Sequence, residues 1–364
     1  GRITTRWCAP AWWRGYSSAP GSWEQLTRWT ACWPRLSWCG DATISLINLA
    51  TNTVTATYPT LGANPTGLAV DSVRNLAVVA NNGGGGSISI INLATGALLP
   101  AGAPVTHADL ANAYAVGINP HNGLALVVRN STTSLANTQA TAIDLVAAMN
   151  PPDPIVLGTV GSSTTPISTG ATPGVAVDAR LNWAIVTPGS IGPVTIVSLG
   201  ERNPLGGLPV GAGRVAIAQL GSNVRGISIN SETRRALLCD PTTQLLPLFS
   251  ILDQSVTNVS NTTPGTPLET GHVATAVNPF TNIGVSVNPS TDLVSVYNLE
   301  APNRMTTFAA GADPVAVDLD PGTNTAVIAN QADGTVTIAN LGAIRSQHIL
   351  DVNPPSLPTS TVDL

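Results

Sequence analysis

The chain contains no lysine, few charged residues and few aromatic residues. All 15 basic residues are Arg, charged residues make up 10% of the 364 residues, and aromatic residues make up 4%. After residue 40, 10 Arg stand against 19 acidic residues. A body this acidic lacks the basic surface with which proteins neutralise nucleic-acid phosphates. We therefore expect no nucleic-acid partner.

The sequence also lacks the usual local signs of a membrane span, a metal site or a catalytic centre. No uninterrupted apolar run approaches the ~18 residues of a spanning helix. The four Cys show neither CxxC nor Cys/His spacing, and the four His are scattered. No GxSxG elbow occurs. We expect no membrane span, no disulfide framework, no metal and no cofactor.

What the chain does contain is apolar residues and turn formers. Hydrophobic residues make up 43%, with 34 Gly and 29 Pro. Such a chain can bury a sizeable core and make many turns. The mild acidity and the low charge density favour an extracytoplasmic protein, whether secreted, periplasmic or at the cell surface. We also expect a monomer.

One apolar pattern recurs seven times. Each copy is a short run rich in β-branched residues that ends in a polar residue and a hydrophobic one, a strand signal. The copies end at Leu49, Leu93, Leu145, Leu199, Leu252, Leu299 and Leu341. Their spacing of 42 to 54 residues is typical of one four-stranded propeller blade per copy. Because a single blade cannot bury both faces, the repeat predicts blades stacked around an axis.

A second pattern recurs six times: a short strand that enters Asp or Asn, with another strand five residues later. These positions are Asp71, Asn119, Asp178, Asn230, Asn278 and Asp320. A short polar side chain there predicts a turn cap that accepts nearby backbone N–H groups. Small residues such as Ala69 and Ala176 suit the innermost strand, where blades converge.

Together the two patterns predict an all-β fold, a seven-bladed β-propeller of four-stranded antiparallel blades. Six blades are complete, and the first has only strands C and D, the outer two of strands A to D counted from the axis. We place the propeller at 41–350. A Trp/Arg/Cys-rich segment precedes it at 1–40, and a Pro/Ser/Thr-rich tail follows at 351–364.

Residues 63–98 and 311–341 carry a family resemblance. They read "ANPTGLAVDSVRNLAVVANNGGGGSISIINLATGAL" and "GADPVAVDLDPGTNTAVIANQADGTVTIANL". Both resemble the YVTN-type β-propeller repeat, although the aromatic residue that the family places before Val-Ala-Asn is Ala or Val here. The resemblance covers residues 41 to about 350 and is weaker in the middle blades. It implies kinship with surface-antigen-like, lactonase-like and quinoprotein dehydrogenase-like propellers.

The first 40 residues break the repeat where strands A and B of the first blade should stand. They hold seven of the eight Trp and three of the four Cys, without alternation. GC-rich DNA read in a wrong frame gives such a composition, so one interpretation is a frameshifted reading of blade sequence. The rival interpretation is a genuine Trp-rich extension that docks on the propeller.

The loops that enter each strand A predict the functional face. They open near the central channel, a usual ligand site in this architecture. The candidate ligand-binding residues on these loops are Asn64, Tyr114, Asn223, Arg225, His272 and Asp313. The alternative is that they are ordinary polar loop residues. The glycine run at 83–86 precedes a strand rather than a helix, so it predicts a hairpin loop and not a phosphate cradle.

These observations favour a non-enzymatic, extracytoplasmic binding or scaffold propeller that engages a protein or a glycan through one face. No residue is assigned as catalytic. The first alternative is a lactonase-like hydrolase with its site at the channel mouth, which needs acidic or His groups to converge there. The second is a quinoprotein dehydrogenase-like subunit, which needs an associated cofactor protein.

Overall fold

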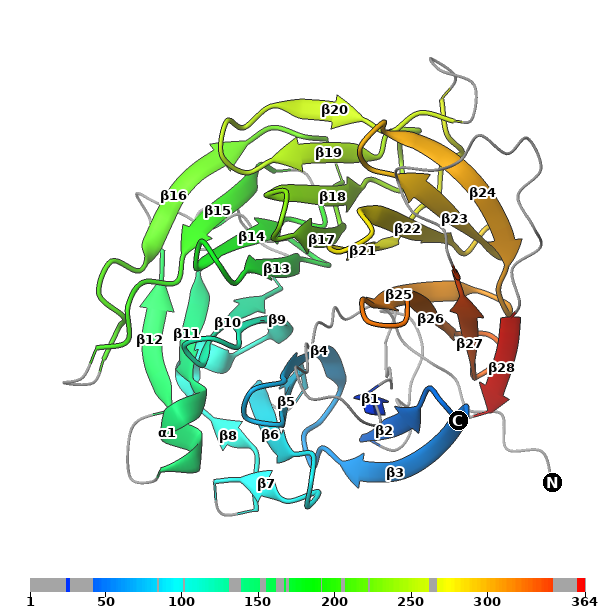
Figure 1. The fold of residues 1–364 in the computed structure, drawn as a ribbon. Helices are drawn as coiled ribbons and strands as arrows, with labels where there is room; N and C mark the ends of the chain where they lie inside the picture. Colours follow the sequence, from blue (N-terminus) through cyan, green and yellow to red (C-terminus); the bar gives the residue numbers. More distant parts are fainter. Residues whose placement is uncertain are drawn as a thin grey trace.

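The computed structural model describes residues 24–26, 42–342 and 359–363, apart from 84, 101, 131–138, 151–154, 162–166, 168–169, 191, 204–206, 222 and 262–266. Its strands form antiparallel sheets that stand like blades around a central axis (Figure 1). Six sheets contain all four strand positions, and the described part of a seventh contains three. The predicted all-β propeller is therefore confirmed, with the seventh blade seen in part.

Blades are numbered here along the chain, so that β1 to β3 form blade 1. The innermost strands of blades 2 to 7 are β4 (Pro65–Asp71), β9 (Ala113–Asn119), β13 (Gly174–Asp178), β17 (Gly226–Asn230), β21 (Ala274–Asn278) and β25 (Pro314–Asp320). The second strands are β5 (Leu76–Asn81), β10 (Leu124–Arg129), β14 (Trp183–Thr187), β18 (Arg235–Cys239), β22 (Ile283–Asn288) and β26 (Thr325–Asn330). The third strands are β2 (Thr43–Asn48), β6 (Ser87–Asn92), β11 (Ala140–Asp144), β15 (Val194–Ser198), β19 (Pro247–Ser250), β23 (Leu293–Asn298) and β27 (Thr335–Asn340). All nineteen of these strands fall on the two recurring sequence patterns.

The outer strands follow a weaker sequence pattern. They are β3 (Thr53–Pro59), the split pair β7 (Leu98–Leu99) and β8 (Val105–Thr106), β12 (Val156–Val160), β16 (Gly213–Ala218), β20 (Val256–Asn258), β24 (Asn303–Ala309) and β28 (Thr359–Asp363). The last of them, β28, lies in the segment 351–364 and pairs with β27. β1 (Glu24–Leu26) pairs with β2. Two short helical elements complete the described chain: η1 (Ala108–Leu110) and α1 (Leu145–Met149).

The apolar cores lie between neighbouring blades. In one of them, Leu124 and Val128 of blade 3 pack with Val186 of blade 4. In another, Ile283 of blade 6 packs with Leu319 of blade 7. All five side chains are buried. Stacking around the axis thus removes from water the sheet faces that an isolated blade would expose.

Blade 1 joins the two ends of the ring through β2. Ile44 and Leu46 share a core with Leu68 of blade 2. Ile47 shares a core with Val327 of blade 7. β2 therefore packs against both neighbouring blades, although blade 1 contributes no innermost strand within the described residues. The segment 1–40 lies outside those residues except for β1, so its two interpretations stay untested.

Each innermost strand ends in the Asp or Asn that the sequence predicts as a turn cap. At Asp178, Oδ1 accepts the backbone N–H groups of Arg180 at 3.0 Å and Leu181 at 3.1 Å. The other five caps likewise accept one or two backbone N–H groups: Asp71, Asn119, Asn230, Asn278 and Asp320. The fourth residue after each cap has positive φ. The capping prediction is confirmed.

The same turns also link neighbouring blades, in a way set by the cap residue. An Asn cap donates its Nδ2 to an Asn of the next blade, whereas two of the three Asp caps, Asp71 and Asp178, lie beside an Arg that reaches across the boundary between blades. The Asn contacts are Asn119 to Asn182 (2.7 Å), Asn230 to Asn282 (3.0 Å) and Asn278 to Asn324 (2.8 Å). The Arg contacts are Arg74 Nη1 to Asp71 Oδ2 (2.8 Å) and the Pro120 carbonyl (3.0 Å), and Arg234 Nε to Asp178 Oδ2 (3.8 Å).

Replacing Asn278 by Asp is expected to destabilise the protein by about 2 kcal/mol, because a buried carboxylate would face two acceptors. Those acceptors, Asn324 Oδ1 and the Pro321 carbonyl, now take hydrogen bonds from Asn278 Nδ2. Urea unfolding measures the loss. The reverse exchange, Asp178→Asn, is the control and should cost less. An Asn278→Asp variant as stable as the native chain would contradict this role for the amide.

Candidate functional site

The two ends of the innermost strands define two faces of the ring. We call the end where these strands begin the entrance face; it consists of residues 60–64, 111–112, 170–173, 220–221, 223–225, 270–273 and 310–313, together with the described residues of the loops that follow the second strands. The opposite end, with the capped turns 71–75, 119–123, 178–182, 230–234, 278–282 and 320–324, is the turn face. All six candidate ligand-binding residues lie at or just inside the entrance face.

Arg225, Asn223 and Tyr114 form one group at this face. Arg225 is half-buried, and its Nε donates to Asn223 Oδ1 at 3.3 Å. Tyr114 is buried, and its burial raises its pKa to about 12 while the charge of Arg225 acts in the opposite direction. Tyr114 therefore stays protonated as part of the core. Arg225 and Asn223 are the members that a ligand can reach.

His272 belongs to a separate, enclosed network in blade 6. Its Nδ1 lies 2.8 Å from Ser286 Oγ, which also lies 2.8 Å from Tyr297 Oη. Its Nε2 lies 4.0 Å from Glu269 Oε2, and Arg304 binds both oxygens of that carboxylate at 2.8 and 2.6 Å. Burial lowers the pKa of His272 to about 4, so its ring is neutral near pH 7.

Ser, His and Glu follow one another in this network as they do in a hydrolytic triad. Unlike the members of a working triad, however, the Ser and the His are not accessible to a substrate. Ser286 is 0% exposed and His272 is 3% exposed. A nucleophile must reach its substrate, and this hydroxyl is sealed between sheets. The network therefore supports the packing of blade 6. Sequence reasoning missed the contact between Ser286 and His272, because the two residues share no local motif.

Asn64 and Asp313 occupy equivalent positions before β4 and β25. Both have positive φ, 57° in each case, a conformation that Asn and Asp tolerate better than most residues. Their backbone carbonyls accept the N–H groups of Asn82 and Gln331. Asp313 also lies near Asp292, and burial together with that charge raises its pKa. The backbone explains these residue types, and the side chains are half-buried at the surface.

Blades 2 and 3 place four Asn residues beside one another at the entrance face, where the Asn82 N–H donates to the Asn64 carbonyl and the Asn130 N–H donates to the Asn112 carbonyl. This asparagine cluster consists of Asn64, Asn82, Asn112 and Asn130. Asn82 Nδ2 donates to Asn130 Oδ1 at 3.1 Å and to the Ala113 carbonyl at 3.2 Å. Asn112 is exposed and has a φ of 60°. Sequence reasoning found Asn64 but missed Asn82 and Asn130, whose only signal is that each follows a second strand.

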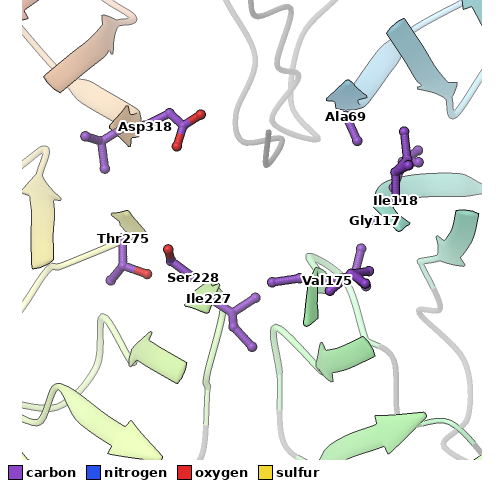
Figure 2. Close-up of a pocket in the computed structure, with 12 residues that line it drawn as sticks. Ala69, Gly117, Ile118, Val175, Ile227, Ser228, Thr275 and Asp318 are labelled. Atoms are coloured by element: carbon purple, nitrogen blue, oxygen red, sulfur yellow. The ribbon is translucent and has the colours of Figure 1, made fainter. Parts of the chain in front are cut away.

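The central channel is the cavity enclosed by the innermost strands, and Figure 2 shows its wall. It holds about 430 Å³ of space, part of it open to solvent. Asp318, Thr275 and Ser228 lie on one side of the view (Figure 2). Ile118 and Val175 line the other side with hydrocarbon. Sequence reasoning did not place Asp318 in this channel.

Within the described residues, no three His, Cys, Asp or Glu side chains are grouped so that they could hold a metal ion. No helix in that part of the chain is long and apolar enough to cross a membrane. His272 is enclosed in blade 6, Arg225 precedes β17, and Asp313 lies beside Asp292. His272 and Asp313, the His and acidic groups that a lactonase-like site would use here, therefore lie in surroundings that differ from each other.

Comparison with known proteins decides the fold and leaves the family open. The chain matches no known family and no curated protein. Among solved structures it matches a chain of the hydrazine synthase of Kuenenia stuttgartiensis, with a TM-score of 0.60 and 13% sequence identity over 84% of this chain and 90% of that one. This chain folds as a β-propeller. At such low identity the likeness shows the fold alone, and the YVTN-type resemblance stays a prediction.

Proposed function

We propose that this propeller is a non-enzymatic binding or scaffold protein that engages a protein or a glycan through its entrance face, outside the cytoplasm. The observation that carries the proposal is the asparagine cluster on blades 2 and 3. A carboxamide both donates and accepts hydrogen bonds and carries no charge. Four of them on one face suit a neutral polar partner, such as sugar hydroxyls or a peptide backbone.

The contacts around the cluster favour a surface that is already ordered before a partner binds. Asn82 and Asn130 hold each other across the boundary between blades 2 and 3. The left-handed backbone conformation at Asn64 and Asn112 sets the direction in which each side chain leaves the main chain. Groups that are held in place before binding lose little conformational freedom when a partner arrives. Arg225 adds a half-buried cation at the same face.

Removing the two outer carboxamides is expected to weaken binding by about tenfold or more, because two hydrogen-bonding side chains are lost. The variant is Asn64→Gly/Asn112→Gly, since glycine keeps the left-handed backbone at both positions. The full-length chain is tested on a glycan array and against a displayed peptide library. The affinity of each ligand found is then measured for the native chain and the variant.

Asn75→Gly is the matched control. Asn75 also has positive φ, is exposed, and lies on the turn face at the other end of β4. The control is expected to bind as the native chain does. Array binding alone identifies a glycan partner, and library binding alone identifies a protein partner. Absence of any ligand, or equal affinity of the double variant and the control, would contradict the proposal.

A further inference from the structure

Arg225 differs from most arginines in the described part of the chain, because no carboxylate there lies within ion-pair distance of it. Five other arginines pair with a carboxylate: Arg74, Arg180, Arg202, Arg234 and Arg304. The side chain of Arg225 instead contacts an uncharged acceptor, Asn223 Oδ1. Its positive charge therefore lacks a close counter-charge.

The backbone and the Nε of Arg225 are held in place, whereas the end of its guanidinium is not. Its N–H donates to the Cys239 carbonyl at 3.0 Å, and its carbonyl accepts the Thr187 hydroxyl of blade 4 at 2.7 Å. Its Nε donates to Asn223 Oδ1 at 3.3 Å, and the Asn223 N–H donates to the buried Asp240 Oδ2 at 3.0 Å. No described residue accepts a hydrogen bond from Nη1 or Nη2. These two nitrogens form a planar fork that matches both oxygens of a carboxylate.

The burial of Arg225 favours an anion at this fork. The side chain is half-buried, so part of its hydration is lost. A cation that has lost water without gaining a counter-charge is less stable than a fully hydrated or paired one. An anionic group that binds the fork offsets this cost. Its attraction to Arg225 is also screened less by salt than the attraction between two exposed charges.

The entrance face offers a negative ligand one favourable side and one unfavourable side. Three carboxylates gather around residues 312–313 on blades 6 and 7. Asp292 Oδ1 accepts the N–H of Asp313 at 2.8 Å, and Asp333 Oδ2 accepts the N–H of Ala312 at 2.6 Å. An anion is repelled there, whereas Arg225 on blade 5 attracts it. A negative group is therefore directed to the side of the face that Arg225 occupies.

Arg225 lies close to the blade that carries half of the asparagine cluster. Burial raises the pKa of Tyr114 to about 12, and the charge of Arg225 acts on that hydroxyl in the opposite direction. Tyr114 follows Ala113, whose carbonyl accepts Asn82 Nδ2 at 3.2 Å, and Asn112 stands just before. The cation and the carboxamides thus border the same start of β9.

This combination of groups suits an acidic sugar better than an acidic peptide. A hydroxyl both donates and accepts hydrogen bonds, so it matches a carboxamide in either orientation. A peptide N–H or C=O matches a carboxamide in one orientation only. A uronic acid carries several hydroxyls and one carboxylate on a single ring. It therefore supplies a partner for the carboxamides and for the arginine together.

We propose that the partner of the entrance face is an acidic glycan, an oligosaccharide that contains uronic acid. Its carboxylate accepts two hydrogen bonds from Nη1 and Nη2 of Arg225. Hydroxyls of the same or a neighbouring sugar bind the asparagine cluster. This inference rests on the proposed function and narrows it to one class of ligand.

Isothermal titration of the full-length chain with matched pairs of sugars tests the inference. Oligosaccharides of galacturonate, glucuronate and mannuronate are each compared with their carboxyl-reduced counterparts, which keep the ring and its hydroxyls but lose the charge. At least one uronate is expected to bind about tenfold or more tighter than its reduced counterpart, because the charge-assisted contact is lost. Equal affinity within every pair, or binding of acidic peptides but of no uronate, would overturn the inference.

Arg225→Gln is expected to weaken uronate binding by about tenfold or more and to leave binding of the reduced sugar unchanged. Arg225→Lys keeps the charge without the fork, so its affinity is expected to fall between the two. Arg180→Gln is the matched control, because it removes the same charge from an exposed site on the turn face. Circular dichroism confirms that each variant is folded. Native affinity for the uronate in folded Arg225→Gln would overturn the role of Arg225.

The same titrations separate failure of this inference from failure of the proposed function. If Asn64→Gly/Asn112→Gly weakens binding but Arg225→Gln does not, the binding surface stands and the carboxylate contact is wrong. If both variants bind as their controls do, the proposed function fails as well.

Discussion

Replacing Gly67 by Ala is expected to lower the free energy of unfolding by about 3 kcal/mol, because the added methyl group would overlap the backbone of the next blade. A Cβ at Gly67 would lie 2.3 Å from the Tyr114 carbonyl oxygen and 2.8 Å from the Ala115 Cα. The neighbouring Thr66 hydroxyl donates to the same Tyr114 carbonyl at 2.9 Å. The boundary between β4 and β9 must therefore open to accept the methyl group.

Gly213→Ala is the control for this experiment. Gly213 begins the outer strand β16, and a Cβ there would meet nothing within 4 Å. The two variants make the same chemical change at the inner and the outer end of a blade. Urea unfolding should show a large loss for Gly67→Ala and almost none for Gly213→Ala. Equal losses in the two variants would mean that the innermost strands are not packed as closely as described.

Acidification is expected to remove about 3 kcal/mol of stability through His272, because burial holds its folded-state pKa near 4 instead of the ordinary 6.5. Below pH 6.5 the unfolded chain takes up a proton that the folded chain refuses, so stability falls as the pH falls toward 4. Glu269 favours the charged ring, whereas Arg304 opposes it. The contribution is therefore fully present above pH 6.5 and lost near pH 4.

His272→Gln tests the assignment because glutamine cannot titrate. Thermal unfolding is followed for the native chain and the variant between neutral pH and pH 4. The variant is expected to be less stable at neutral pH, since Ser286 loses its contact with the ring, but to lose less stability on acidification. His121→Gln, an exposed site on the turn face, should keep the native pH dependence. An unchanged acid loss in His272→Gln would show that other groups cause it.

The sequence predicts the repeating parts of the fold because they obey local rules. The third strands end in a polar residue that caps the next turn, as Asn92 does by accepting the N–H groups of Ala94 and Thr95. The Asp and Asn caps of the innermost strands work in the same way. Such contacts span two or three residues, so their pattern is legible in a single repeat.

What the sequence could not predict depends on contacts between repeats. The side chain of Asn119 caps its own turn, but its amide reaches Asn182, 63 residues away. Ser286 of β22 contacts His272, which precedes β21 in the same blade. The candidate residues lie at one face of the ring, whereas their division into an exposed group and an enclosed network required the three-dimensional arrangement.

The same limit explains the outer strands. β3 and β24 follow clear alternating segments, whereas blade 2 divides its outer position between β7 and β8. The outer strand of blade 7 comes from β28. An edge strand packs against one neighbour only, so its sequence is less restricted than that of an inner strand. The outer strands therefore show a weaker sequence pattern than the inner strands.

The central claim is that the entrance face is the binding surface. Hydrogen–deuterium exchange, measured in the presence of the ligand selected in the binding assays, tests it. Exchange is compared for the native chain with and without that ligand. The account predicts slower exchange at residues 60–64 and 111–112, beside the asparagine cluster, and no change in the turns 71–75 and 119–123. Protection confined to those turns, or to the outer strands, would contradict it.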